Sequence, residues 1–244
     1  MSPSPIKPLF TAKATAFGGR NGTSKAEDGS VSVVVMTGAG NKAFVSGADI
    51  SQFEKNRDSA DAQAEYDRAT GVGRDKFHAF RKPIVARIRG FCMGGGLAIA
   101  MATDLRIASA DSQFGIPAAR LSIAYAPDAV KRLIDLVGPA HAHKILYTAK
   151  RIDAAEAERI GLINKMTTEE ALNDVVLDIA RTIADNAPLS VAASKLTINE
   201  MVKDESQRDM AAIKRMGEVC FNSADYKEGR TAFMEKRQAR FVGR

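Results

Sequence analysis

Short apolar runs alternate with amphipathic segments in the first half of the chain. Residues 31–36 form a nearly continuous β-branched run, and residues 83–88 form a second apolar run. Each run has a single polar position, Ser32 in the first and Arg87 in the second. Such nearly continuous apolar runs are typical of strands that are buried on both faces. Residues 105–108 and 113–115 predict two further short strands with a turn between them. The first half of the chain therefore predicts a sheet whose strands are connected by helices.

The second half of the chain carries mainly the periodicity of helices. The predicted helices cover residues 127–136, 141–148, 154–160, 170–186, 189–203, 204–221 and 226–237. Gly138 separates the first two helices, and Gly161 follows the third at the position where a glycine commonly ends a helix. Residues 162–166 predict one short strand among these helices. The whole pattern describes an α/β layer with a helical extension.

Residues 1–30 give the weakest pattern. Prolines near the start and a glycine-rich run at residues 18–24 favour turns, and only residues 9–17 predict a single strand. We therefore divide the chain into an irregular N-terminal arm at residues 1–30, an α/β core at residues 31–187 and a helical region at residues 188–244.

Composition and charge exclude several classes of partner. Hydrophobic residues make up 45% of the chain and charged residues 26%, which is ordinary for a globular protein, and the net charge is +6. The basic excess is modest and scattered, except at the C-terminus, where four basic residues cluster, namely Lys236, Arg237, Arg240 and Arg244. They indicate either a solvated helix end or a contact with a phosphate-bearing ligand. Because long basic runs and zinc-type spacings are missing from the sequence, we expect no nucleic-acid partner.

The cysteines and the apolar runs bear on location. Cys92 and Cys220 are far apart and lack a metal-binding spacing, so we expect reduced thiols and no metal site. No apolar run approaches the roughly 18 residues that a membrane span needs, and no leader of the secretory type opens the sequence. We therefore expect a cytoplasmic protein that has no membrane partner.

Two strand-to-helix junctions carry the candidate chemistry. The first spans residues 33–50 and contains Gly47, and the second spans residues 83–96 and ends on three consecutive glycines. Each predicts a buried strand, a glycine-bearing turn and a helix start, with Asp49 as the N-cap in the first case. N–H groups at a helix start lack acceptors within the helix and attract negative charge. Two such starts that face one point would form an oxyanion hole.

Other interpretations of the glycines stay open. Gly38, Gly40 and Ala43 have the spacing of a dinucleotide-binding turn, which would suit a nicotinamide dehydrogenase, although residues 41–47 separate these glycines from the next helix. The glycines at residues 94–96 could instead serve only to let a helix pack closely on a strand. The sequence has no Gly-x-Ser-x-Gly elbow, so we expect no serine-hydrolase triad.

The residues around these junctions match a known family in several places. The matching segments are residues 43–50, 82–96, 114–117, 153–164 and 228–237. In this order they resemble the crotonase superfamily, the enoyl-CoA hydratases and isomerases, over residues 31–244. The resemblance implies a crotonase-like ββα spiral with a helical C-terminal trimerisation region, usually a homotrimer or a dimer of trimers. It also implies an acyl-CoA thioester as substrate, no separate cofactor and a place in fatty acid metabolism.

The resemblance further implies which residues form the site. The thioester oxygen would lie between the N–H groups of Ala48 and Gly95, which would stabilise an enolate-like intermediate. The other implied ligand positions are Ser46, Gly47, Asp49, Ile50, Gly94, Pro117, Phe233 and Lys236. The last two match positions near the adenine and phosphates of CoA. Family members normally begin with a β-hairpin and a helix, and residues 1–30 are too short for that whole unit.

The sequence departs from the family at two positions. Hydratases of the family use two glutamates as acid and base on the water, and the matching positions here are Ala98 and Ala118. General acid–base help is worth about 10²–10⁴-fold per group, so these alanines disfavour ordinary hydration. Tyr125 and Asp128 are the candidate replacements. Tyr125 matches a tyrosine of a decarboxylating branch of the family, and Asp128 could equally be an N-cap. A decarboxylase, an isomerase, a thioesterase and a non-catalytic acyl-CoA-binding homologue all stay open.

Overall fold

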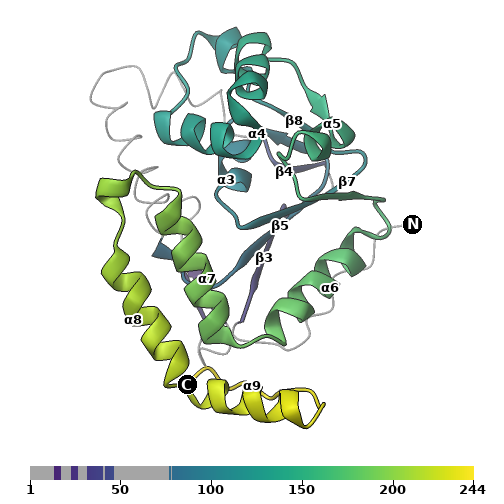
Figure 1. Ribbon diagram of the computed structural model, residues 1–244. Helices are drawn as coiled ribbons and strands as arrows, with labels where there is room; N and C mark the ends of the chain where they lie inside the picture. Colours follow the sequence, from purple (N-terminus) through teal and green to yellow (C-terminus); the bar gives the residue numbers. More distant parts are fainter. Residues whose placement is uncertain (1–13, 18–22, 27–31, 41, 47–76, 78) are drawn as a thin grey trace. The chain divides into compact units, whose positions relative to one another are not determined.

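A computed structural model describes residues 14–17, 23–26, 32–40, 42–46, 77 and 79–244 (Figure 1). The chain forms two compact units. The first comprises residues 1–30, 35–79 and 84–176, and the second comprises residues 31–34, 80–83 and 177–244. The predicted division into an arm, a core and a helical region stays a prediction.

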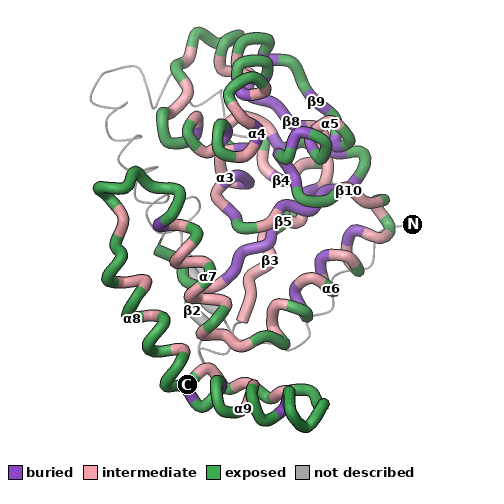
Figure 2. Tube along the Cα trace, in the orientation of Figure 1, coloured by how far each residue is buried: buried purple, intermediate pink, exposed green. Residues whose placement is uncertain are grey.

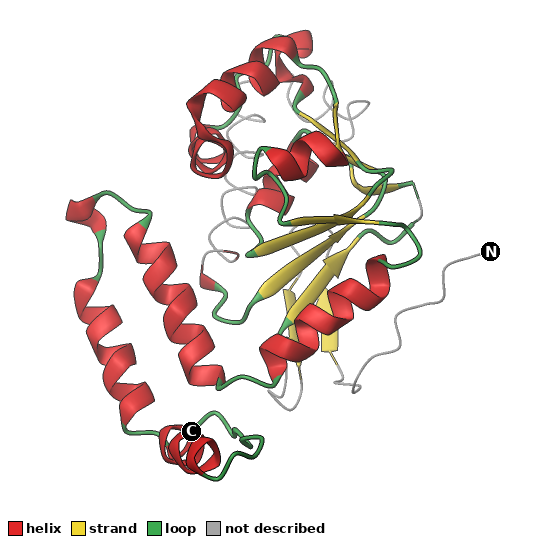
Figure 3. Ribbon diagram, turned by 45° about the vertical axis from the view of Figure 1, so that its right-hand side comes forward, coloured by secondary structure: helices red, strands yellow, loops and turns green. Residues whose placement is uncertain are grey.

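Two four-stranded sheets form the body of the first unit (Figure 3). The first sheet has the order β10 (Lys165–Thr167), β7 (Leu105–Ser109), β5 (Ile84–Ile88) and β3 (Val34–Thr37). The second has the order β4 (Ala43–Val45), β6 (Phe91–Met93), β8 (Gln113–Gly115) and β9 (Ile152–Asp153). The pairs β10–β7, β7–β5, β4–β6 and β6–β8 are parallel, and β8–β9 is antiparallel.

The strands enter these two sheets in turn along the chain. β5 joins the first sheet and β6 the second, and the helix α3 (Gly95–Met101) follows. β7 and β8 repeat this order and lead into the 3₁₀ helix η2 (Pro117–Leu121) and the helix α4 (Pro127–Thr148). The α/β fold class is therefore confirmed, with the repeated ββα order and the parallel pairing that the resemblance predicts.

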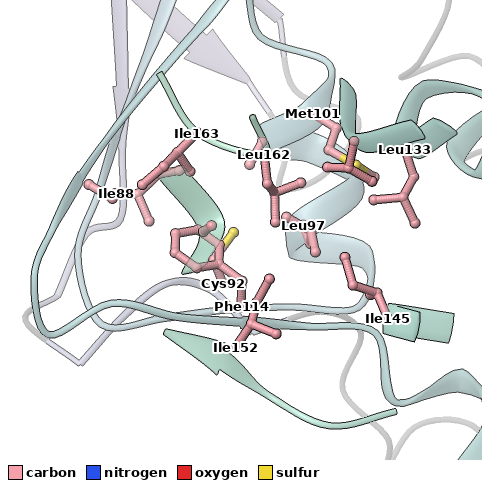
Figure 4. Packing of buried hydrophobic residues seen from close by; sticks show 14 of the residues in the cluster. Ile88, Cys92, Leu97, Met101, Phe114, Leu133, Ile145, Ile152, Leu162 and Ile163 are labelled. Carbon is pink, nitrogen blue, oxygen red and sulfur yellow. The ribbon is translucent and has the colours of Figure 1, made fainter. Parts of the chain in front are cut away.

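One buried cluster joins both sheets to the helices of the first unit (Figure 4). Ile88 of β5, Cys92 of β6 and Phe114 of β8 are fully buried there with Leu97 of α3. Figure 2 shows β5 buried over most of its length, as its apolar run predicts. The same prediction is wrong for β3, which is only half-buried because it lies at the edge of its sheet.

The sequence pattern does not predict two of the short strands. β6 lies within the segment that predicts a single glycine turn, and β9 lies beside a predicted N-cap. Neither segment has enough alternation to stand out from the turn and cap signals around it, because the pleat has a period of two residues. Both are defined by their pairing with β8, which a linear pattern does not contain.

The predicted helix boundaries in the first unit largely hold. Gly138 interrupts α4 with a φ of 73°. Asp153 caps α5 (Ala154–Arg159) by accepting the N–H of Glu156 at 2.8 Å, and Gly161 follows it with a φ of 82°. The strand predicted at residues 162–166 begins only at Lys165, because the preceding residues form a buried turn after Gly161.

The N-terminal strand prediction is incomplete. β1 (Ala14–Phe17) pairs in antiparallel orientation with β2 (Thr23–Ala26), whereas the sequence predicts one strand at residues 9–17. β2 contains almost no apolar side chain, so apolar periodicity could not reveal it. The predicted N-cap at Asp49 and the segment after it lie outside the described residues up to residue 76.

The second unit is helical in the part that the structure describes. Its helices are α7 (Pro188–Met201), η3 (Glu205–Gln207), α8 (Met210–Phe221) and α9 (Ala224–Met234), while α6 (Leu172–Ala184) begins in the first unit. The single helix predicted at residues 204–221 is divided, and Asp209 caps its longer part. The buried Asp225 carboxylate accepts the N–H groups of Val242 and Gly243, which folds the C-terminal tail against α9.

Close packing of α3 on β4 generates a stability prediction. A Cβ on Gly96 would overlap the backbone carbonyl of Val45, so Gly96→Ala requires a backbone shift. We expect Gly96→Ala to lower the free energy of unfolding by about 1–3 kcal/mol or more. A chemical-denaturation midpoint measures this change.

Gly217→Ala is the matched control. Gly217 lies inside α8, and an added Cβ meets no atom there within 4 Å. This substitution should stabilise the chain by roughly 0.5–1 kcal/mol, because alanine loses less backbone entropy in a helix. Equal midpoints for the two variants would contradict the close-packing argument.

Candidate functional site

The three consecutive glycines of the second junction occupy three different environments. Gly94 has a φ of 53° and a ψ of −120°, a backbone conformation that side chains disfavour. Gly96 is buried against the backbone of Val45. Gly95 lies between them and is exposed. Gly94 therefore supports the turn through its backbone conformation, Gly96 allows close packing of the helix, and Gly95 is the residue that leaves its backbone accessible.

The N–H of Gly95 begins a helix. Gly95 is the first residue of α3, so its N–H has no acceptor within that helix. Its neighbour Gly94 is tied to the sheet, because the Gly94 N–H donates to the carbonyl of Gly115 at 2.8 Å. Sequence reasoning does not single out Gly115, since the bond depends on the pairing of β6 with β8.

The first junction is described only in part. β4 ends at Val45, and Ser46 follows it as an exposed residue. The predicted site residues Gly47, Ala48, Asp49 and Ile50 lie outside the described residues. The Ala48 N–H as the second oxyanion donor therefore stays a prediction.

The two alanines lie on elements that adjoin the glycine turn. Ala98 lies one turn into α3, and its N–H donates to the carbonyl of Gly94 at 3.1 Å. Pro117 opens η2, and its Cδ lies 3.8 Å from the place where a Cβ on Gly94 would stand. Ala118 follows Pro117 and packs against the core. Both alanine side chains are half-buried methyl groups that cannot transfer a proton.

Tyr125 reaches the turn from the loop before α4. Its hydroxyl donates to the carbonyl oxygen of Gly94 at 3.0 Å, and its ring packs against the core. Burial raises the pKa of Tyr125 above its usual range, and the negative charges of Cys92 and Asp128 act in the same direction. Tyr125 is therefore a neutral hydrogen-bond donor at ordinary pH. The sequence identifies this residue as a candidate but does not reveal its partner.

Asp128 is not an N-cap, so that interpretation is wrong. Ala126 holds the N-cap position of α4, Pro127 is the first helical residue and Asp128 is the second. Asp128 is exposed. Burial lowers the pKa of Arg132 on the same helix, and the charge of Asp128 opposes this shift, whereas the same charge adds to the rise in the pKa of Tyr125 that burial causes. An acidic side chain in the first turn suits the positive end of the helix dipole.

The cysteine beside the turn is not a nucleophile. Cys92 lies in β6, two residues before Gly94, and is fully buried. Burial raises the pKa of its thiol to about 12, so the thiolate is scarce at neutral pH. Among the described residues, no group of His, Cys, Asp and Glu side chains could hold a metal ion. The helices described here are also too short or too polar to cross a membrane.

Phe233 and Lys236 belong to the second unit. Phe233 on α9 is 81% exposed, and Lys236 is exposed just beyond the end of that helix. Their neighbour Arg237 is held by Glu228 through two hydrogen bonds of 2.7 and 2.9 Å. This arginine therefore has a structural partner, whereas the contact of Phe233 and Lys236 with CoA stays a prediction.

Comparisons with known proteins point to the family that the sequence motifs resemble. A family model described as enoyl-CoA hydratase/isomerase matches residues 23–244. A crotonyl-CoA hydratase of Syntrophomonas wolfei is 39% identical over 225 residues, which cover 91% of this chain and 85% of that protein. A short-chain-enoyl-CoA hydratase of Clostridium acetobutylicum is 38% identical and is matched over 86% of this chain and 80% of that protein.

Solved structures give the same result for the fold. The crystal structure of an enoyl-CoA hydratase/carnithine racemase from Magnetospirillum magneticum matches with a TM-score of 0.81 at 32% identity. The match covers 87% of this chain and 79% of that one. Since the family model spans most of the sequence and the structures share the ββα architecture, the chain belongs to the enoyl-CoA hydratase/isomerase family and has the crotonase fold.

Proposed function

We propose that this enzyme binds an acyl-CoA thioester and stabilises the enolate form of its acyl group. The Gly95 N–H donates to the thioester oxygen, and the Ala48 N–H is the second donor. The observation that carries the proposal is the exposed Gly95. The Gly94 carbonyl, in the same peptide as the Gly95 N–H, accepts from Tyr125, and the Gly94 N–H of the preceding peptide donates to Gly115. The similarity to a crotonyl-CoA hydratase and to a short-chain-enoyl-CoA hydratase supports the same substrate class.

An enolate oxygen carries more negative charge than the thioester carbonyl from which it forms. Donors that are already aimed at this oxygen stabilise the transition state without reorganising, and one such donor is worth roughly 10²–10³-fold in rate. The remaining ligand contacts in the proposal come from Ser46, Gly47, Asp49, Ile50, Gly94, Pro117, Phe233 and Lys236. The reaction needs no cofactor besides the CoA of the substrate, and we propose that the enzyme works in the cytoplasm.

Decarboxylation is the second candidate reaction, and Ala98 and Ala118 favour it. Hydration needs groups that move protons on and off water, and methyl groups supply none. When a malonyl-type thioester loses CO₂, the electrons of the broken C–C bond pass into the enolate, so no base has to remove a proton from carbon. A proton from solvent then completes the product at the α-carbon. Isomerase and thioesterase variants would instead need Tyr125 or Asp128 as the proton-transfer group.

A panel of thioesters tests the proposal. We expect malonyl-CoA or methylmalonyl-CoA to be turned over faster than crotonyl-CoA is hydrated, with a 3-enoyl-CoA included for isomerisation. Chromatography of the CoA products measures turnover, and calorimetry measures binding in parallel. Binding without turnover on any member would identify a non-catalytic acyl-CoA-binding protein. If no thioester binds to the folded protein, the proposal is wrong.

Restoring the two carboxylates tests the explanation for weak hydration. Ala98→Glu and Ala118→Glu together should raise the hydration of crotonyl-CoA by about 10²-fold or more, since each acid–base group is worth about 10²–10⁴-fold. Each single variant is the control and should gain much less. A folded double variant that binds crotonyl-CoA but hydrates it no faster than the original chain would contradict this explanation.

We also propose that the second unit contributes to a homotrimer or a dimer of trimers. Large apolar side chains that are at least about half exposed gather on its helices. They are Ile198, Val202, Met210, Val219, Phe221, Phe233 and Met234. Exposed apolar surface of this kind is typical of interfaces between subunits.

Light scattering after size-exclusion chromatography tests the assembly. The expected mass is three or six times the 26.2 kDa of one chain. Ile198→Glu combined with Phe221→Glu should shift the mass towards the monomer, because charges would be buried between copies. Tyr147→Glu, at an exposed aromatic residue of α4, should leave the mass unchanged. A monomeric mass for the original chain would refute the proposed assembly.

A further inference from the structure

The peptide group between Gly94 and Gly95 has two ends with different partners. Its carbonyl belongs to Gly94 and its N–H to Gly95, and the group is planar. The peptide bonds of the described residues are trans, so this carbonyl and this N–H point in opposite directions. Whatever fixes the carbonyl direction therefore also fixes the direction of the N–H that we assign to the oxyanion hole.

Neighbouring glycines make this peptide easy to rotate. A glycine samples φ values that other residues avoid, and Gly94 has a φ of 53°. The Gly94 carbonyl accepts two hydrogen bonds, from the Ala98 N–H at 3.1 Å and from the Tyr125 hydroxyl at 3.0 Å. The first bond is local to α3. The second comes from a residue 31 positions further along the chain and ties the peptide to a separate element.

We infer that Tyr125 is a positioning residue, whose hydroxyl fixes the plane of the Gly94–Gly95 peptide and thereby aims the Gly95 N–H at the thioester oxygen. This inference rests on the function proposed above. A donor on a carbonyl also polarises the peptide, which makes its N–H a stronger donor. The effect of Tyr125 on the substrate therefore passes through the backbone and grows as negative charge develops on the thioester oxygen.

The hydrogen bond distinguishes this role from proton transfer. The Tyr125 hydroxyl already donates its hydrogen bond to the Gly94 carbonyl, and burial keeps the phenol neutral. A proton donor to the substrate would have to break this bond first. Asp128 and Cys92 are the titratable neighbours that raise the pKa of Tyr125, and neither charge favours loss of its proton.

Tyr125→Phe removes the hydroxyl and keeps the ring that packs against the core. We expect kcat for the best thioester of the panel to fall roughly fivefold to tenfold, the factor of one neutral hydrogen bond, with KM changed less than twofold. Tyr147→Phe is the control, because Tyr147 is 76% exposed and should affect neither quantity. A loss of more than about 10²-fold with an unchanged carbonyl spectrum would instead assign proton transfer to Tyr125 and overturn the inference.

The carbonyl spectrum reports the hydrogen bond itself, without any need for turnover. Butyryl-CoA labelled with ¹³C at the thioester carbon is the probe, and infrared difference spectroscopy gives the shift of its carbonyl stretch on binding. The original chain should lower this frequency, and Tyr125→Phe should reduce the shift. An equal shift in both proteins would overturn the inference, whereas bound probe with no shift in either would instead refute the oxyanion hole.

A second variant covers the case in which Tyr125→Phe does not fold. Incorporation of 3,5-difluorotyrosine at position 125 keeps the hydroxyl and makes it a stronger donor. It should enlarge the shift of the bound probe, the opposite of the effect of phenylalanine. A smaller or unchanged shift in this folded variant would contradict the positioning role.

Discussion

The anchoring of one peptide group, between Gly94 and Gly95, is the constraint on which the site depends. Its carbonyl, which belongs to Gly94, accepts from α3 and from Tyr125, and the preceding peptide donates the Gly94 N–H to Gly115 of the second sheet. Gly96 lets α3 approach the backbone of β4. The sheet, the helix and the loop before α4 thus all contact a single turn. Gly95 is the exposed residue of that turn, where we propose that the ligand binds.

The side chains around this turn limit the chemistry that it can support. Ala98 and Ala118 carry methyl groups that cannot transfer a proton, and the thiol of Cys92 is buried and protonated. Tyr125 is neutral, and its hydroxyl donates to the backbone carbonyl of Gly94. A site with backbone donors and few proton-transfer groups suits a reaction in which the enolate forms without a base, which is why we place decarboxylation beside the general proposal.

Much of the fold follows from local sequence signals. The apolar run of β5, the N-cap at Asp153 and the glycines at 138 and 161 all act over a few residues, and the structure confirms them. The motifs around the glycine turns were enough to indicate the family. The edge position of β3 and the short strands β6 and β9 depend on pairing with distant segments, so a linear pattern gave the wrong burial for one and missed the others.

The candidate site, too, was predicted in part from the sequence and decided in part by the tertiary structure. The sequence by itself determined the glycines, the two alanines and the candidate role of Tyr125, because residue type alone fixes whether a group can move a proton or adopt a positive φ. Only the tertiary structure decided that Gly94 adopts a positive φ, that Gly96 packs against β4, that Asp128 is no N-cap and that Tyr125 binds the Gly94 carbonyl. These outcomes depend on which backbone atoms meet across elements, and such contacts between residues far apart along the chain are set by packing.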